Sequence, residues 1–249
     1  MKIACVIVAA GQGTRLGDEW KNTPKALVPI LGRPLLYYSL NAFDDFNGID
    51  NSAGITRFVV TAPPDLVAKF EKIIASWGFS IPTTVVKGGK ARSESVLNGL
   101  KALESDPPDI VMIHDCARCC LTSSMIKKLS PKFQNGDGAT LAHPESDTLR
   151  LVLDNRISDE LQRDVVACIE TPQMFPYRRI MELHLNVPND PRHPDPPPDD
   201  TTLFTRASET VHVVYHGENN IKVTYPEDIG AAEGILFSRG WMDVNDEEE

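Results

Sequence analysis

Apolar and polar positions along the 249-residue chain follow strand and helix periods in turn. The first apolar run, residues 3–10, is short, rich in β-branched side chains and closed by a glycine, which predicts a fully buried strand. Helical and strand patterns then alternate, which predicts a mostly parallel sheet flanked by helices. Further strands are expected over residues 56–61, 83–86, 109–114, 138–143 and 211–215. Helices are expected over residues 34–46, 65–77, 122–132 and 226–237. Three more are expected: one that begins at residue 92 or 93, one that follows residues 172–175 and ends near 185, and a short one just after residue 200.

Residues 146–170 depart from this alternation. They form two β stretches around an Asp154-Asn155 turn, with charged residues interleaved among apolar ones. Because a two-stranded ribbon is marginal on its own, we expect this β-arm to pack on a second copy of the chain. The rest is interpreted as a single domain over residues 1–249, with a Pro-rich loop at 187–199 and an acidic tail at 243–249. The loop is interpreted as a spacer in preference to a lid.

Composition and charge exclude several classes of protein. Hydrophobic residues make up 41% and charged residues 24%, as in an ordinary globular protein. No apolar run approaches the ~18 residues of a membrane span, and the N-terminal run is interpreted as a strand and not a signal peptide. The net charge of −10, without a Lys/Arg-rich tract, argues against a nucleic-acid partner. Five cysteines without a second close pair favour a reduced, cytoplasmic chain over a zinc site.

The glycine loop after the first strand indicates anion binding. Gly11 and Gly13 allow a sharp turn and close approach of a ligand to the backbone, and successive N–H groups in such a loop attract anions. Arg15 and Lys25 add two cations, which suits a triphosphate. The glycine spacing differs from the dinucleotide-binding motif by one residue, and no G-K-[ST] closes the loop as in a P-loop.

Two other predicted strand ends carry polar residues. Gly88 and Gly89 follow the third strand and precede a helix whose first turn contains Ser95. Asp115 is expected just beyond the fourth strand, followed by Arg118. Because ligands of open α/β sheets bind outside the carboxyl ends of strands, the three strand ends predict one shared site. His114 is interpreted as a structural support.

Several blocks together resemble the 2-C-methyl-D-erythritol 4-phosphate cytidylyltransferases of non-mevalonate isoprenoid synthesis. The blocks are AAGQGTRLG…PKAL, GG-x-x-R-x-x-SV-x-NGL, HDCAR, DTLR, Arg163…ETPQMF and NIKVT-x-PED. The resemblance implies a glycosyltransferase-A-like α/β fold, a β-arm that protrudes for dimerisation, and transfer of CMP from CTP to a polyol phosphate with release of pyrophosphate. It also implies Mg²⁺, which we expect to be held mainly by CTP phosphates, with unknown protein ligands.

The resemblance further implies roles for individual residues. Catalytic charge neutralisation would come from Arg15, Lys25 and Lys222. The nucleotide would also contact Ala9, Ala10, Gly11, Gly13, Gly89 and Ser95. The polyol phosphate would contact Asp115, Arg118, Thr148, Arg163 and Thr171. Thr148 and Arg163 lie on the arm and would therefore reach the partner's site.

Two alternatives stay open at the level of sequence. The related ribitol 5-phosphate cytidylyltransferases share the fold and many blocks, although Ala9-Ala10-Gly11 and Ser95-Val96 favour the methylerythritol family. Pro198 stands where a threonine is usual, and Lys90 where an acidic residue is common. These departures leave room for a nucleotide-binding dimer with little activity.

Overall fold

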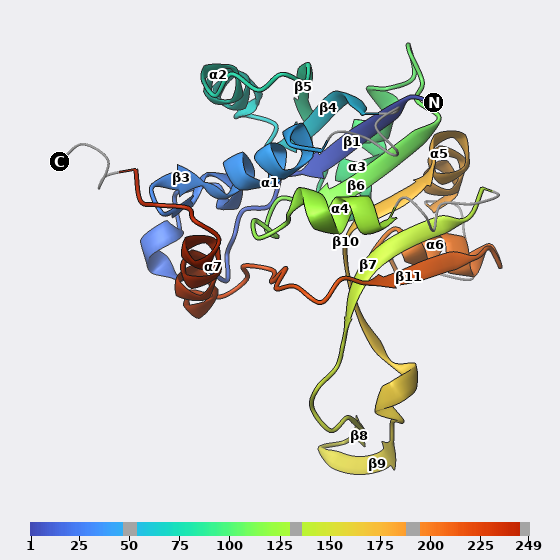
Figure 1. Ribbon diagram of the computed structural model, residues 1–249. Helices are drawn as coiled ribbons and strands as arrows, with labels where there is room; N and C mark the ends of the chain where they lie inside the picture. Colours follow the sequence, from blue (N-terminus) through green and yellow to red (C-terminus); the bar gives the residue numbers. More distant parts are fainter. Residues whose placement is uncertain (47–53, 130–135, 188–194, 245–249) are drawn as a thin grey trace.

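A seven-stranded sheet forms the centre of the computed structural model, which describes residues 1–46, 54–129, 136–187 and 195–244 (Figure 1). The strand order is β11-β7-β10-β6-β1-β4-β5. All these strands run parallel except β10, which is antiparallel to both neighbours. The bounds are β1 Ile3–Val8, β4 Ile55–Ala62, β5 Thr83–Lys87, β6 Ile110–Asp115, β7 Gly138–Pro144, β10 Ala167–Pro176 and β11 Val211–Tyr215. The predicted mostly parallel α/β fold is thus confirmed.

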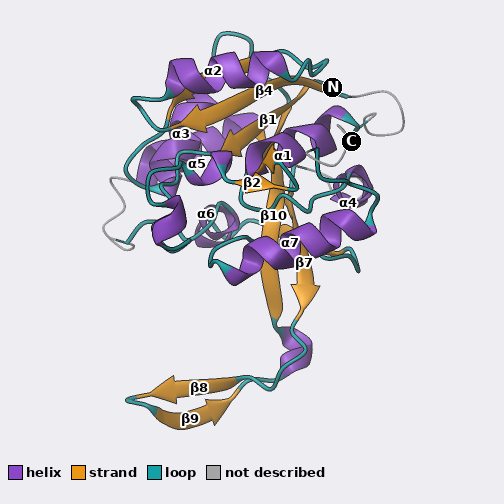
Figure 2. Cartoon of the chain, turned by 90° about the vertical axis from the view of Figure 1, so that its left-hand side faces the viewer, coloured by secondary structure: helices purple, strands orange, loops and turns teal. Residues whose placement is uncertain are grey.

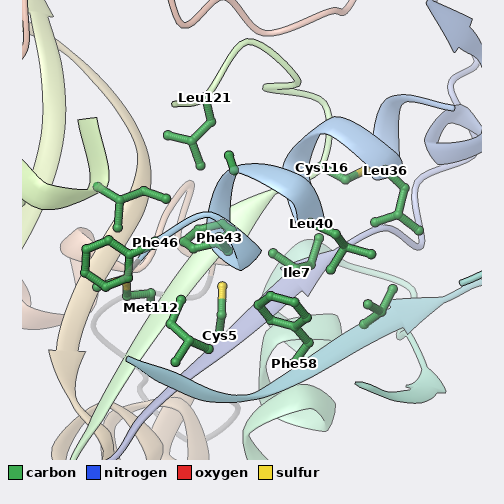
Figure 3. Close-up of a cluster of buried hydrophobic side chains, with 14 of the residues drawn as sticks. Cys5, Ile7, Leu36, Leu40, Phe43, Phe46, Phe58, Met112, Cys116 and Leu121 are labelled. Carbon is green, nitrogen blue, oxygen red and sulfur yellow. The ribbon is translucent and has the colours of Figure 1, made fainter. Parts of the chain in front are cut away.

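Helices cover both faces of this sheet because its central strands are apolar on both sides. Side chains of β1 alternate, with Cys5 and Ile7 in one buried cluster and Val6 in another. The first cluster, part of which Figure 3 shows, includes side chains of α1, α2 and α4; the second includes side chains of α3, α5 and α6. The helices are α1 Leu35–Asp44, α2 Val67–Ser76, α3 Arg92–Lys101, α4 Ser123–Leu129, α5 Tyr177–Asn186, α6 Thr201–Arg206 and α7 Glu227–Ser238.

A third buried cluster attaches α7 to the segment that follows the glycine loop. Leu16, Val28 and Ile30 pack there with Leu236 of α7. The segment contains four short elements that the sequence pattern did not predict: the 3₁₀ helices Asp18–Trp20 and Lys25–Leu27 and the paired strands β2 (Pro29–Ile30) and β3 (Arg33–Pro34). This packing fixes the chain just before and just after Lys25.

The expectation that residues 172–175 merely lead into a helix is wrong. They belong to β10, a ten-residue strand between β6 and β7. Pro172 lacks an N–H and argued against a central strand. The sheet tolerates it because β10 pairs with β6 only from Gln173 onward, and its register with β7 shifts between Ile169 and Gln173. Similarly, Asp115 is the last residue of β6 and not a residue beyond it.

The arm is an antiparallel ribbon of β8 (Arg150–Leu153) and β9 (Arg156–Glu160), which protrudes from the sheet (Figures 1 and 2). Asp154 and Asn155 form its turn with φ of 48° and 59°, a conformation that Asp and Asn tolerate better than most residues. Every residue of both strands is exposed, including Val152 at 62% and Ile157 at 72%. The ribbon therefore presents apolar side chains that this chain does not cover.

Parts of four expectations lie outside the described residues. They concern the turn-rich stretch at 47–53, the end of the helix at 130–132, residues 188–194 of the Pro-rich loop and residues 245–249 of the acidic tail. In the described ranges, no helix combines the length and apolarity needed to cross a membrane.

The packing of α3 on β1 generates a stability prediction. A Cβ at Gly99 would lie 2.5 Å from Cγ1 of the buried Val6, whereas a Cβ at Gly234, on the exposed side of α7, would meet nothing within 4 Å. We expect Gly99→Ala to lower the free energy of unfolding by about 1–3 kcal/mol through overpacking. Gly234→Ala should raise it by about 0.5–1 kcal/mol through helix propensity. Urea unfolding of both variants measures the difference, and a Gly99→Ala protein as stable as the parent would contradict this packing.

Candidate active site

The candidate site lies at the carboxyl ends of β1, β5 and β6. A pocket of about 300 Å³ is lined by residues at or just after the end of each of these strands, including Gly11, Gly89 and Asp115. Parallel neighbouring strands place such loops side by side, which explains how residues a hundred positions apart meet. The cations of this pocket are Arg15, Lys25, Lys90, Arg92 and Lys222.

The glycine loop after β1 is shaped by backbone geometry. Gly13 has a φ of +69°, and a Cβ there would lie 3.0 Å from Cβ of Lys25. The backbone N–H of Lys25 donates to the carbonyl of Gly11 at 3.3 Å, so the loop and the lysine are connected directly. A Cβ at Gly11 would meet nothing within 4 Å, which leaves the backbone there open to close approach by a ligand.

The second glycine turn is held by Ser95. Its hydroxyl accepts a hydrogen bond from the N–H of Gly89 at 3.0 Å and lies 3.1 Å from the carbonyl of Ala91. A Cβ at Gly88 would lie 2.2 Å from Cβ of Ala10, so only glycine lets the two loops approach each other this closely. Ser95 therefore shapes the wall of the pocket while its buried hydroxyl is engaged within the protein.

Asp115 is the central charge of the site. Arg92 Nε donates to its Oδ1 at 2.8 Å and Lys222 Nζ to its Oδ2 at 2.6 Å. Burial by itself would raise the pKa of the Asp115 carboxyl, but Arg92 and Lys222 hold it well below its usual range. The carboxylate is thus ionised and fixes two cations from distant parts of the chain.

A second pocket, of about 410 Å³, shares Arg92, Asp115 and Lys222 with the first. Arg118 and Thr171 also line it, together with residues around Pro198. The two pockets are therefore neighbours separated by one ion-pair network, an arrangement that suits two anionic ligands held next to each other.

The surroundings of Lys25 lower the pKa of its side chain. Partial burial lowers the pKa of its ammonium group, and the nearby cations Lys222 and Arg15 lower it further. Arg15 lies with its guanidinium carbon 5.7 Å from the ring centroid of Tyr225, within cation–π range. The three cations predicted from the sequence therefore lie close enough to influence one another.

Thr171 is held by a buried polar chain. The backbone N–H of Asp115 donates to Thr171 Oγ1 at 3.0 Å, and the same hydroxyl lies 3.0 Å from Nδ1 of His114. Burial lowers the pKa of His114 to about 3, so its ring is neutral and Nδ1 can accept the hydroxyl proton. His114 thus has the geometry of a support for Thr171.

The structure does not bring all predicted residues together. Ala9 and Gly13 lie on the glycine loop but line neither pocket. Thr148 and Arg163 lie in the arm segment between β7 and β10, remote from both pockets, and the Arg163 guanidinium donates to the carbonyl of Ser146.

Sequence reasoning missed the role of Arg92 as a site residue. It lines both pockets and donates to Asp200 Oδ2 at 2.8 Å as well as to Asp115, while Asp200 in turn meets His184 Nε2 at 2.9 Å. The signal was present, because Arg92 stands in the first turn of the helix that follows a glycine turn. Its carboxylate partners are 23 and 108 residues away, so no local pattern could reveal them.

A third cleft lies on the outer side of the same glycine loop. It has a volume of about 710 Å³ and is lined by Gln12, Thr14 and Asp65, among others. Lys21 is its only lining cation among the residues that the structure describes. Size alone therefore does not identify an anion site here; the convergence of cations favours the two smaller pockets.

A doubly covered, mostly parallel sheet with a glycine loop and two adjoining cationic pockets at its carboxyl edge defines the class of nucleotidyltransferases. The 2-C-methyl-D-erythritol 4-phosphate cytidylyltransferase family model matches residues 3–238. The chain belongs to that family.

Individual relatives are similar over their whole length. An enzyme named 2-C-methyl-D-erythritol 4-phosphate cytidylyltransferase from Caldanaerobacter subterraneus is 33% identical over 95% of this chain and 99% of its own. One of the same name from Cereibacter sphaeroides is 34% identical over 95% and 97%. The solved 4-diphosphocytidyl-2C-methyl-D-erythritol synthase of Anaerococcus prevotii has a TM-score of 0.77 at 24% identity, covering 94% of this chain and 98% of that one. That likeness supports the fold.

The lowered pKa of Lys25 generates a prediction about pH. Because the free enzyme loses this proton below the ordinary lysine pKa of about 10.4, kcat/KM for CTP should fall on an alkaline limb displaced to lower pH. Arginine keeps its charge to higher pH, so Lys25→Arg should move the limb upward even at reduced activity. Initial rates across pH measure this, with Lys21→Arg as the control. A limb unchanged by Lys25→Arg would show that another group titrates.

Proposed function

We propose that this chain transfers CMP from CTP to 2-C-methyl-D-erythritol 4-phosphate and releases pyrophosphate. Membership of the family and the names of relatives more than 30% identical support the reaction. The structural observation that carries the proposal is the shared wall of the two pockets, formed by Arg92, Asp115 and Lys222. Such a wall lets one ligand lie on each side with the reacting phosphates meeting beside Lys222.

CTP would occupy the pocket beside the glycine loop. Its triphosphate would lie against the open backbone at Gly11, with Arg15 and Lys25 as counter-charges. The polyol phosphate would occupy the second pocket, which is lined by Arg118, Lys222 and Thr171. The role of each residue follows from its place on the pocket wall and from the chemistry of its side chain.

The reaction needs little covalent participation by the protein. A phosphate oxygen of the acceptor attacks the α-phosphorus of CTP in line, a new P–O bond forms, and the bond to the pyrophosphate oxygen breaks. A phosphate monoester is already anionic near neutral pH, so no general base is needed. Catalysis therefore depends mainly on positioning and on stabilisation of the developing negative charge. Arg15, Lys25 and Lys222 supply the positive charge for that stabilisation.

Mg²⁺ is expected to accompany the nucleotide. The chain builds no cage for it: in the described ranges, no group of three or more His, Cys, Asp or Glu side chains could hold a metal ion. Both oxygens of Asp115 are engaged by Arg92 and Lys222. A metal held mainly by phosphate oxygens and water fits this donor set, and it would add charge neutralisation to the triphosphate.

The arm would complete the site of a partner subunit. Its exposed apolar residues, such as Val152, Ile157 and Val165 at 80%, would be buried in a homodimer. Thr148 and Arg163, which lie away from this chain's own pockets, would then contact the polyol phosphate bound to the partner.

A second acceptor has one specific observation in its favour. Pro198 lines the second pocket next to Asp199 and offers no hydroxyl there. The threonine hydroxyl usual there would contact the acceptor's phosphate, so its loss leaves D-ribitol 5-phosphate as a candidate to be tested beside methylerythritol phosphate.

Pyrophosphate release tests the function directly. We expect release with CTP, Mg²⁺ and 2-C-methyl-D-erythritol 4-phosphate, and at least tenfold less with D-ribitol 5-phosphate. Lys25→Ala should lower turnover by about 10²–10³, by analogy with loss of an oxyanion donor, because one cation of the transition state is lost. Lys21→Ala, an exposed lysine of the same segment, is the matched control and should stay within twofold. Preference for ribitol phosphate would reassign the acceptor, and no release with either would contradict the proposal.

Mixing inactive subunits tests the shared site. Lys25→Ala leaves the arm intact and Arg163→Ala leaves the core intact, so a heterodimer would contain one complete site. Random reassortment should therefore restore about one quarter of parental activity, since half of the dimers are mixed and each has one working site. Unmixed variants are the controls. Absence of any recovery after verified exchange would place Arg163 outside the partner's site.

A further inference from the structure

A buried carboxylate, that of Glu170, forms part of the wall of the second pocket. Its side chain is 2% exposed and meets three other side chains: His143 Nδ1 lies 2.6 Å from Oε1, and His216 Nε2 and Asn220 Nδ2 lie 3.1 and 2.6 Å from Oε2. Arg118 NH1 lies 4.0 Å from Oε1. We call these five residues the Glu170 cluster.

The Glu170 cluster joins segments that are far apart in the chain. His143 stands near the end of β7, just before the chain leaves for the arm, and Glu170 stands in β10, just after it returns. His216 follows β11, and Asn220 precedes Lys222 by two residues. The cluster therefore ties both roots of the arm to the segment that carries Lys222.

Two members connect the cluster to the pocket wall. Arg118 donates to the carbonyls of Asn220 at 2.8 Å and Ile169 at 3.3 Å. Asn220 Nδ2 also donates to the carbonyl of Thr171 at 3.0 Å. Arg118 and Thr171, two residues proposed to face the acceptor phosphate, are thus connected to Glu170 through at most two contacts, and the third, Lys222, follows Asn220 by two residues in the chain.

The chemistry of a buried anion shows what Glu170 can do. Burial alone would raise the pKa of its carboxyl, but His216, Arg118, His143 and Asn220 lower it, so the group stays ionised. An anion next to a pocket for phosphate would repel the ligand if it faced it freely. Here Arg118 lies 4.0 Å away and offsets the charge, while both oxygens accept hydrogen bonds from protein side chains and make no direct contact with a ligand.

A metal site is not an alternative explanation of these residues. Glu170, His143 and His216 do not form a group able to hold a metal ion, and no such group is found in the part of the chain that the structure describes. Asn220 enters the cluster through Nδ2, a hydrogen-bond donor and not a metal ligand. The contacts are those of a hydrogen-bonded connector.

We propose that Glu170 is a positioning residue, which holds Arg118 and the Asn220–Lys222 segment in place against the acceptor pocket and connects them to the root of the arm. The inference rests on the proposed function, since it assigns the acceptor phosphate to that pocket. It predicts that loss of the carboxylate impairs use of the acceptor more than use of CTP. Lys222 lines both pockets, but Arg118 and Thr171 line only the acceptor pocket, and Arg15 and Lys25 line only the CTP pocket.

The test compares Glu170→Gln with Asn220→Ala and a matched control. Glutamine keeps the shape but places an amide N–H₂ where donors of the cluster point, so at least one contact is lost. We expect KM for the polyol phosphate to rise by about tenfold and kcat to fall, with KM for CTP within twofold. Asn220→Ala should show the same split. Asp137→Asn is the control. Asp137 precedes β7 and lies 2.8 Å from His212 of β11, at the ends of these strands opposite to His143 and His216.

A second readout separates this inference from the proposed function. Hydrogen exchange of peptides covering residues 216–224 in the ligand-free protein should be faster in Glu170→Gln than in the parent, by about tenfold, and unchanged in Asp137→Asn. Parental kinetic constants and parental exchange in Glu170→Gln would overturn the proposal. So would equal changes in both KM values together with a similar effect of Asp137→Asn, because the carboxylate would then be only structural.

If the parent releases no pyrophosphate, the proposed function fails, and exchange alone decides whether Glu170 holds the segment. If Glu170→Gln does not fold, Asn220→Ala decides by the same two measurements.

Discussion

The site depends on one buried carboxylate that lets like charges gather at one edge of the sheet. Without Asp115, Lys222 would lose its carboxylate partner next to Lys25 and Arg15, and Arg92 would keep only Asp200. Partly buried cations repel one another strongly because the local dielectric is low. Asp115 offsets this repulsion while leaving the outer cations available to a ligand. A triphosphate and a phosphate monoester can then complete the charge balance that the protein leaves open.

The position of that carboxylate follows from the sheet and not from local sequence. Asp115 ends β6, which pairs with β1, and the register places Asp115 opposite Val8, where the glycine loop begins. Lys222 reaches the same point because the segment after β11 returns across the sheet, with Val223 donating to the carbonyl of Ala117 at 2.9 Å. Parallel topology thus converts three unconnected stretches into one wall, and the apolar clusters on both faces keep that wall in register.

Sequence predicts this arrangement well where the pattern is local and poorly where it is not. The apolar period of β1, the glycine turns and the alternation of elements predict the fold class, and the family blocks predict the family. The strand β10 was not predicted at residues 172–175, because a proline inside a central strand is unfavourable unless the register shifts around it. Arg92 and the Glu170 cluster were missed for a different reason. Their partners lie 23 to 108 residues away, and only the folded sheet brings them together.

The local positive charge of the site lets an acidic protein bind anionic substrates. The chain carries a formal charge of −10, yet Arg15, Lys25 and Lys222 face one pocket. At physiological ionic strength, charges farther apart than about 8 Å in solvent are largely screened from one another. A ligand entering the pocket therefore responds to the cations beside it and hardly to the acidic surface elsewhere. A buried anion such as Glu170 is screened much less. Its charge is offset by Arg118 at 4.0 Å, and its oxygens accept hydrogen bonds from His143, His216 and Asn220.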